Sequence, residues 1–204
     1  MAFVDDLALL LFLMSLVDVI ALYTTGNLYL NYRKGKLDDV EGIMRPGAFA
    51  MAPMAVVMLI LGLFGEIIWP LPGSYNILFY DPFVMVSIIM LILSIEVILK
   101  QKLQTVGIIG LFAGLIAIYY AAYAYIDNMT SSPIAMLGLY IGFGATGIFM
   151  FPATLIYDSV GEKKKMSKIW TVFLVLFWIS LVGSGILAAF TASAAVPQHL
   201  LNPP

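Results

Sequence analysis

Residues 7–30 read LALLLFLMSLVDVIALYTTGNLYL, a stretch in which Asp18 is the only acidic residue and no basic residue occurs. About 20 apolar residues form a helix long enough to cross the hydrocarbon core of a bilayer, which is about 30 Å thick. The stretch is too long for the core of a cleavable signal peptide, and no basic residue precedes it. We therefore expect a retained transmembrane helix.

Five further apolar runs follow, bounded by charged residues, glycine or proline, at residues 47–69, 82–99, 106–126, 134–157 and 169–190. Of the 204 residues, 62% are hydrophobic and 11% are charged, against about 45–50% and about 25% in typical soluble domains. This composition excludes a water-soluble single domain and leaves too little chain for a soluble catalytic domain. The predicted fold is all-α: one polytopic transmembrane domain, residues 1–204, forming a bundle of six transmembrane helices.

All ten lysine and arginine residues fall in the first, third and fifth connections between the predicted helices. They are Arg33, Lys34, Lys36, Arg45, Lys100, Lys102, Lys163, Lys164, Lys165 and Lys168. Short loops rich in these residues stay in the cytoplasm, which predicts a multi-pass protein of the cell membrane with both termini outside. The formal net charge of −2 gives no reason to expect nucleic acid.

Three acidic residues lie inside the predicted helices, and none of the six runs contains a lysine or arginine that could pair with them. Asp18 lies near the middle of its helix, Glu66 near the outer end of the second and Glu96 near the inner end of the third. An acid at mid-membrane costs about 2.5–3.5 kcal/mol, and such residues commonly carry function. Glu66 and Glu96 can reach headgroups or water, whereas Asp18 cannot.

Asp18 shares one helical face with Ser15, Thr25 and Tyr29, which predicts that this face packs against protein. Protonation, hydrogen bonds from neutral donors or a bound cation would each make the buried carboxyl tolerable. The candidate donors on other helices are Ser87, Tyr119, Tyr120, Tyr123, Thr146 and Ser180. The alternative to a functional role is a protonated Asp18 that only locks the bundle.

The most polar part of any predicted helix is YTTGN at residues 23–27. Thr25 and Asn27, together with Asp158 at the inner end of the fifth helix, are predicted to line an inward-facing vestibule. Asp158 would equally cap a helix or pair with a nearby lysine. The single histidine, His199, and the absence of cysteine exclude a haem with two histidine ligands, a mid-membrane zinc site of three histidines and thiolate metal sites, so no cofactor is predicted.

Glycines recur at helical spacing where close helix packing is expected. Gly107, Gly110 and Gly114 form a stripe on the fourth predicted helix. Packing through small residues replaces the hydrophobic drive that lipid does not supply. The string from Gly142 to Gly147 matches a dinucleotide-binding fingerprint, but that motif needs a preceding strand. We therefore expect it to serve packing as well.

The segment SYNILFYDP at residues 74–82 and the segment Thr25-Gly-Asn27 carry a family resemblance. Together with the layout of six spans, they resemble an archaeal group of membrane proteins catalogued as domain of unknown function 981. The resemblance covers nearly the full chain and implies a six-span fold. It implies no activity, and it transfers no site residue.

Two functions are consistent with these patterns. A small transporter or channel would move protons or another cation past Asp18, with Glu66 and Glu96 as outer and inner way-stations. The other residues assigned to such a pathway are Thr25, Asn27, Tyr119, Tyr123 and Asp158. A non-catalytic membrane subunit or scaffold would instead bind lipid, quinone or a partner protein.

An intramembrane enzyme is a weaker alternative, because it would need two carboxylates at one depth. The positions of Asp18 and Asp158 in the sequence do not predict that. Membrane lipids are expected partners. The aromatic and glycine faces would also suit a second copy of the chain or a partner membrane subunit.

Overall fold

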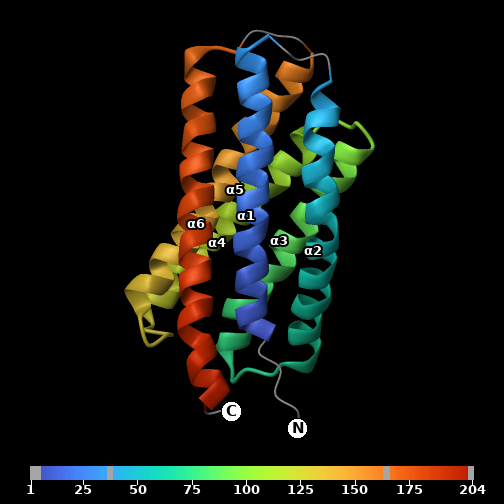
Figure 1. Ribbon diagram of the computed structural model, residues 1–204. Coiled ribbons are helices and arrows are strands. Elements are labelled where there is room, and N and C mark those ends of the chain that lie inside the picture. The colour runs from blue at the N-terminus through green and yellow to red at the C-terminus, as the bar shows by residue number, and fades with distance from the viewer. Residues whose placement is uncertain (1–5, 36–38, 163–165, 202–204) are drawn as a thin grey trace.

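The computed structural model describes residues 6–35, 39–162 and 166–201, and within those ranges it shows six α-helices and no strand (Figure 1). The helices are α1 (Asp6–Arg33), α2 (Val40–Ile68), α3 (Ser74–Ile98), α4 (Gln104–Ile126), α5 (Pro133–Gly161) and α6 (Lys168–Leu201). Each is long and apolar enough to cross a membrane. The prediction of an all-α bundle with six spans is confirmed, and the chain is a multi-pass membrane protein.

The helices form a ring in which each packs on its neighbours in the sequence, and α6 closes the ring by packing on α1. Among neighbouring pairs, α4 packs most extensively on α5, and α3 packs least extensively on α4. α1 begins and α6 ends at the same end of the bundle, here called the terminal end (Figure 1). The opposite end, here called the basic end, carries every lysine and arginine that the structure describes. Lys36 and residues 163–165 lie outside the described residues.

The sidedness of the two ends can be measured with single cysteines, because the natural chain has none. We expect a membrane-impermeant maleimide, applied to intact cells, to label Ser131→Cys between α4 and α5. The same reagent should leave Gln101→Cys, between α3 and α4, unlabelled until the membrane is opened, because loops rich in lysine stay in the cytoplasm. Both positions are exposed in the structure. The reverse labelling pattern would put the terminal end in the cytoplasm.

Two helices begin well before their predicted boundaries. α2 begins at Val40 rather than at residue 47, and the side chain of Asp39 caps it by accepting the Gly42 N–H at 2.8 Å. α3 begins at Ser74 rather than at residue 82. The predicted third run begins at Pro82, whereas Pro82 lies inside α3.

A hydrogen bond from another helix explains how α3 continues through Pro82. Proline has no N–H, so the carbonyl of Leu78, four residues earlier, lacks its donor within the helix. The hydroxyl of Tyr140, on α5, donates to this carbonyl instead. Neighbouring helices commonly restore backbone hydrogen bonds that proline removes inside membranes. The contact ties α3 to α5 beside the central space of the bundle.

Glycine lets the backbones of α4 and α5 approach each other closely. A Cβ atom built on Gly114 would lie 2.6 Å from the carbonyl oxygen of Gly144, and one on Gly147 would lie 2.6 Å from that of Gly110. A Cβ on Gly107 would lie 2.1 Å from a side-chain oxygen of α5. The predicted packing role is confirmed both for the stripe on α4 and for the string that resembles a nucleotide-binding motif.

Candidate functional site

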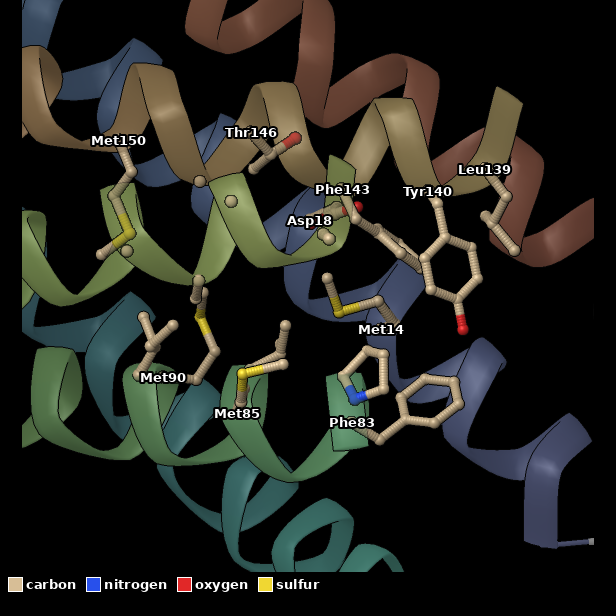
Figure 2. A pocket seen from close by; sticks show the side chains of 18 of the residues that line it. Met14, Asp18, Phe83, Met85, Met90, Leu139, Tyr140, Phe143, Thr146 and Met150 are labelled. Atoms are coloured by element: carbon tan, nitrogen blue, oxygen red, sulfur yellow. The ribbon is translucent and has the colours of Figure 1, made fainter. Parts of the chain in front are cut away.

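A cavity in the middle of the bundle, here called the central cavity, lies among α1, α3, α4 and α5, with Thr191 of α6 at its edge, and has a volume of about 70 Å³. Methionine and phenylalanine side chains form part of its mostly apolar walls (Figure 2). They are Met14, Met85, Met90, Met150, Phe79, Phe83 and Phe143. Because thioether side chains are flexible and polarisable, such walls adapt to apolar molecules of varied shape.

Four polar side chains border the central cavity: Asp18, Tyr140, Thr146 and Thr191. The hydroxyl groups of Tyr140, Thr146 and Thr191 each donate to a backbone carbonyl. Their protons are therefore already used. Asp18 is the one acidic group at this cavity, and it lies at the middle of α1.

Asp18 is only 2% exposed, and Ser184 of α6 donates its hydroxyl proton to Asp18 Oδ2 at 2.8 Å. Ser184 has a single proton, and the carbonyl of Ser180 competes for it at the same distance of 2.8 Å. In the described part of the chain, Asp18 Oδ1 accepts no hydrogen bond. Gly185 permits the close approach of α6, because a Cβ there would lie 3.3 Å from the Cβ of Asp18. The carboxyl is therefore only partly satisfied by the protein.

A second cavity, also apolar, continues from the central cavity. The two share Met90, Thr146 and Met150 as lining residues. Thr25 lies on the wall of the second cavity, where its hydroxyl donates to a carbonyl one turn earlier at 2.7 Å and accepts the indole N–H of Trp178 at 3.0 Å. Thr25 is therefore part of a contact between α1 and α6.

A third cavity, here called the polar cavity, lies at the basic end and is lined by Lys100, Gln101, Lys102, Asp158 and Glu162 among others. It shares Met44, Val97, Leu103 and Tyr157 with the second cavity. The three cavities therefore form a row from the middle of the bundle to the basic end. Of the three, only the polar cavity has several charged side chains on its wall.

Two acidic side chains satisfy the N-terminus of α4. Asp158 of α5 accepts the backbone N–H groups of Leu103 and Gln104 at 2.9 and 3.1 Å, and Glu96 of α3 accepts that of Val106. A helix N-terminus leaves N–H groups without intrahelical partners and carries partial positive charge. The capping alternative for Asp158 is confirmed. Glu96 also faces this N-terminus, but its Oε2 is buried without a hydrogen-bond partner among the described residues.

An ion pair at the basic end joins Lys102 Nζ to Glu162 Oε1 at 2.8 Å. The Glu162 carboxylate raises the pKa of Lys102, through both its hydrogen bond and its charge. The lysine side chain is 72% exposed, so water screens the pair and its contribution to stability is small.

A group here called the terminal polar cluster lies at the other end and comprises Asp6, Glu66, Tyr80, Asp81 and Tyr120. Tyr80 donates to Asp6 at 2.7 Å, and Tyr120 donates to Asp81 at 2.5 Å. Glu66 lies within hydrogen-bonding reach of Asp81. The cluster ties α1, α2, α3 and α4 together. Within the described ranges, no group of three acidic or histidine side chains could hold a metal ion.

A family model described as "Protein of unknown function (DUF981)" matches residues 1–202. The chain belongs to this family. No curated protein and no solved structure matches it. Membership of the DUF981 family assigns no activity.

The structure of this DUF981 chain does not bring Tyr119, Tyr123 or Asn27 to Asp18. Tyr119 and Tyr123 lie on an exposed face of α4 with their ring centroids 4.8 Å apart, and they border a separate pocket at the terminal end. Asn27 accepts hydrogen bonds from Asn31, one turn further along α1. α1 packs on α2 and α6, so side chains on the outer face of α4 cannot reach it.

The predicted vestibule is also not formed as expected. Thr25 lines the second cavity, whereas Asp158 lines the polar cavity, and Tyr157 is a wall residue of both. Asn27 lines neither of them. Asp18 and Asp158 line different cavities, so these two residues do not form the carboxylate pair that an intramembrane enzyme would need.

Sequence reasoning missed Ser184 as the donor to Asp18 and missed the methionine walls of the central cavity. Ser180 and Ser184 lie four residues apart and therefore on one face of α6, a pattern that could have indicated the donor. The role of Tyr140 as a hydrogen-bond donor was missed as well. Pro82 could have indicated that such a donor is needed, because a proline inside a membrane helix frees a carbonyl that another side chain must satisfy.

Proposed function

We propose that the protein binds a small, largely apolar molecule from the bilayer in the central cavity, next to Asp18. The observation that carries this proposal is an apolar cavity of flexible side chains with a single carboxyl group on its wall. Binding sites for small molecules commonly combine mostly apolar walls with a few polar groups that orient the ligand. The proposal develops the expectation of a membrane subunit that binds a lipid-like molecule.

The packing of the helices supports entry of the ligand from the bilayer, between two neighbouring helices. The central cavity borders both α3 and α4, and these two helices pack least extensively of all neighbouring pairs. The glycines of α4, Gly107, Gly110 and Gly114, have their close contacts with α5. A membrane-soluble molecule would therefore enter between α3 and α4 without crossing water.

A photoreactive alkanol tests this proposal. A ten-carbon alcohol with a diazirine on its chain, irradiated with the protein in lipid nanodiscs, should attach to peptides of α3 and α5 that contain Met85 and Phe143. Ala117→Phe should abolish this labelling, because Ala117 lies on the cavity wall and the added ring fills the space. Ala122→Phe is the matched control on α4, since Ala122 is exposed on the outer surface and its variant should label like the natural protein.

Labelling that is equal in the Ala117→Phe and natural proteins would contradict the proposal. So would labelling confined to exposed residues such as Phe112, because such residues face the bilayer in any case.

A second candidate function is the movement of protons or another cation past Asp18. It is supported by the shared walls of the three cavities, which connect Asp18 with the polar cavity at the basic end. The apolar lining of the first two cavities speaks against it, because a proton or an ion needs water or polar groups along its route.

Proteoliposomes distinguish the two functions. Binding alone predicts that a pH gradient across vesicles containing the protein decays at the same rate with the natural chain and with Asp18→Asn. A decay that the natural chain accelerates and Asp18→Asn does not would establish transport instead.

A further inference from the structure

We infer that the molecule bound in the central cavity carries a basic amine, and that the Asp18 carboxylate binds its ammonium group. The inference rests on the proposed function and names the class of ligand: an amphiphilic amine with an apolar body. Three observations carry it, namely the state of the Asp18 carboxyl, the polar groups around it and the aromatic walls.

The first observation is that the protein supplies no positive charge for Asp18. Lysine and arginine lie only at the basic end of the described bundle, and Asp18 lies at the middle of α1. A buried carboxyl is tolerated when it is protonated, or when a cation or several hydrogen bonds compensate its charge. Among the described residues Asp18 receives one hydrogen bond, on Oδ2, from a serine that also faces a carbonyl at the same distance. Oδ1 is left for a ligand.

The second observation concerns the other polar groups of the cavity. The hydroxyls of Tyr140, Thr146 and Thr191 donate to carbonyls, so none is left as a donor to the polar group of a ligand. Asp18 is then the side chain that determines which polar head group of a ligand the cavity accepts. A carboxylate accepts hydrogen bonds and repels other anions, which excludes fatty acids and other acidic lipids as the preferred ligand.

The third observation is the aromatic wall. Phe79, Phe83, Phe143 and Tyr140 line the cavity that Asp18 borders. Aromatic rings attract cations through their negative faces, and organic ammonium groups are recognised in this way. A hard metal ion would need several oxygen ligands, and this cavity offers one carboxyl among thioethers and rings. The chemistry of the walls therefore fits an organic ammonium ion and not a metal.

A matched pair of probes tests the inference. A ten-carbon primary amine and a ten-carbon alcohol, each with the same diazirine on the chain, differ only in the head group. In nanodiscs of uncharged lipid, the natural protein should reach half-maximal labelling of the cavity peptides at an amine concentration at least about tenfold below that of the alcohol, because hydrogen bonds to charged groups are the strong ones. Asp18→Asn should label equally with both probes. Glu96→Gln removes an acidic side chain of α3 that faces the N-terminus of α4, and this variant should keep the preference for the amine.

A second measurement needs no variant. In the natural protein, decyltrimethylammonium should displace the amine probe from the cavity, whereas decyl sulfate at the same membrane concentration should not. Displacement by both detergent-like ions to the same extent would overturn the inference, because it would show that the cavity recognises only the chain.

The outcomes separate the two proposals. Equal labelling of the natural protein by amine and alcohol would overturn the inference and leave cavity binding intact. A preference for the amine that persists in Asp18→Asn would also overturn it. Absence of cavity labelling with either probe would overturn the proposed function itself.

Discussion

Gly114→Ala is expected to destabilise the bundle by about 3 kcal/mol, the upper part of the range for adding a methyl group to a well-packed interior. The new Cβ would lie 2.6 Å from the carbonyl oxygen of Gly144 and 2.8 Å from the backbone nitrogen of Ile148. Both atoms belong to the backbone of α5, so neither can rotate away, and the two helices must separate. Unfolding by SDS in mixed micelles measures the change.

Gly183→Ala is the matched control, because a Cβ built on Gly183 in α6 meets no atom within 4 Å. Alanine is a better helix former than glycine by up to about 1 kcal/mol, so this variant should be as stable as the natural protein or more stable. Equal stability of the two variants would contradict the close backbone packing of α4 on α5.

Tyr140→Phe is expected to cost about 1–3 kcal/mol of stability, the penalty for leaving a buried carbonyl without a donor. The variant keeps the ring of Tyr140 and removes only the hydroxyl that donates to Leu78. The stability lost in Tyr140→Phe should depend on the presence of Pro82. When Pro82 is replaced by alanine, the new N–H can donate to the same carbonyl, so the double variant should recover most of the stability that Tyr140→Phe loses.

The control for this cycle is Tyr125→Phe, at a position that is 44% exposed on α4; it should change stability by less than about 0.5 kcal/mol. Additive effects of Tyr140→Phe and Pro82→Ala would show that the tyrosine does not replace the missing backbone donor. The same unfolding assay serves all three variants.

The sequence predicted the helices because hydropathy over about 20 residues directly reflects the thickness of the bilayer. It predicted close helix packing along one face of α4 because Gly107, Gly110 and Gly114 repeat at helical spacing. It misplaced the start of α3 because Asp81 and Pro82 were taken to bound the apolar run. The hydrogen bond that lets the helix pass Pro82 comes from Tyr140, 58 positions away in the sequence as numbered, and no local pattern contains it.

The partner of Asp18 was missed for a related reason. Helical periodicity predicts which residues share a face, but it does not predict which helix that face meets. In the structure α1 packs between α2 and α6, so Ser184 can donate to Asp18, whereas Tyr119 and Tyr123 on α4 cannot. The closure of the ring by α6 decides this arrangement, and it depends on contacts between the first and last helices.

The central cavity could not be predicted from the sequence either. Its methionines come from three helices, with Met14 on α1, Met85 and Met90 on α3 and Met150 on α5. Each is an ordinary apolar residue within its own helix. The space among them arises because glycine draws α4 toward α5 while α3 packs loosely on α4.

An experimental structure in lipid nanodiscs, determined at a resolution that shows ordered water, tests the central claim most directly. We expect density for an elongated molecule between Met85 and Phe143, with its polar end at Asp18 Oδ1. A chain of ordered waters from Asp18 toward the polar cavity would contradict it and favour transport. A central space closed by its own methionine side chains would contradict both functions.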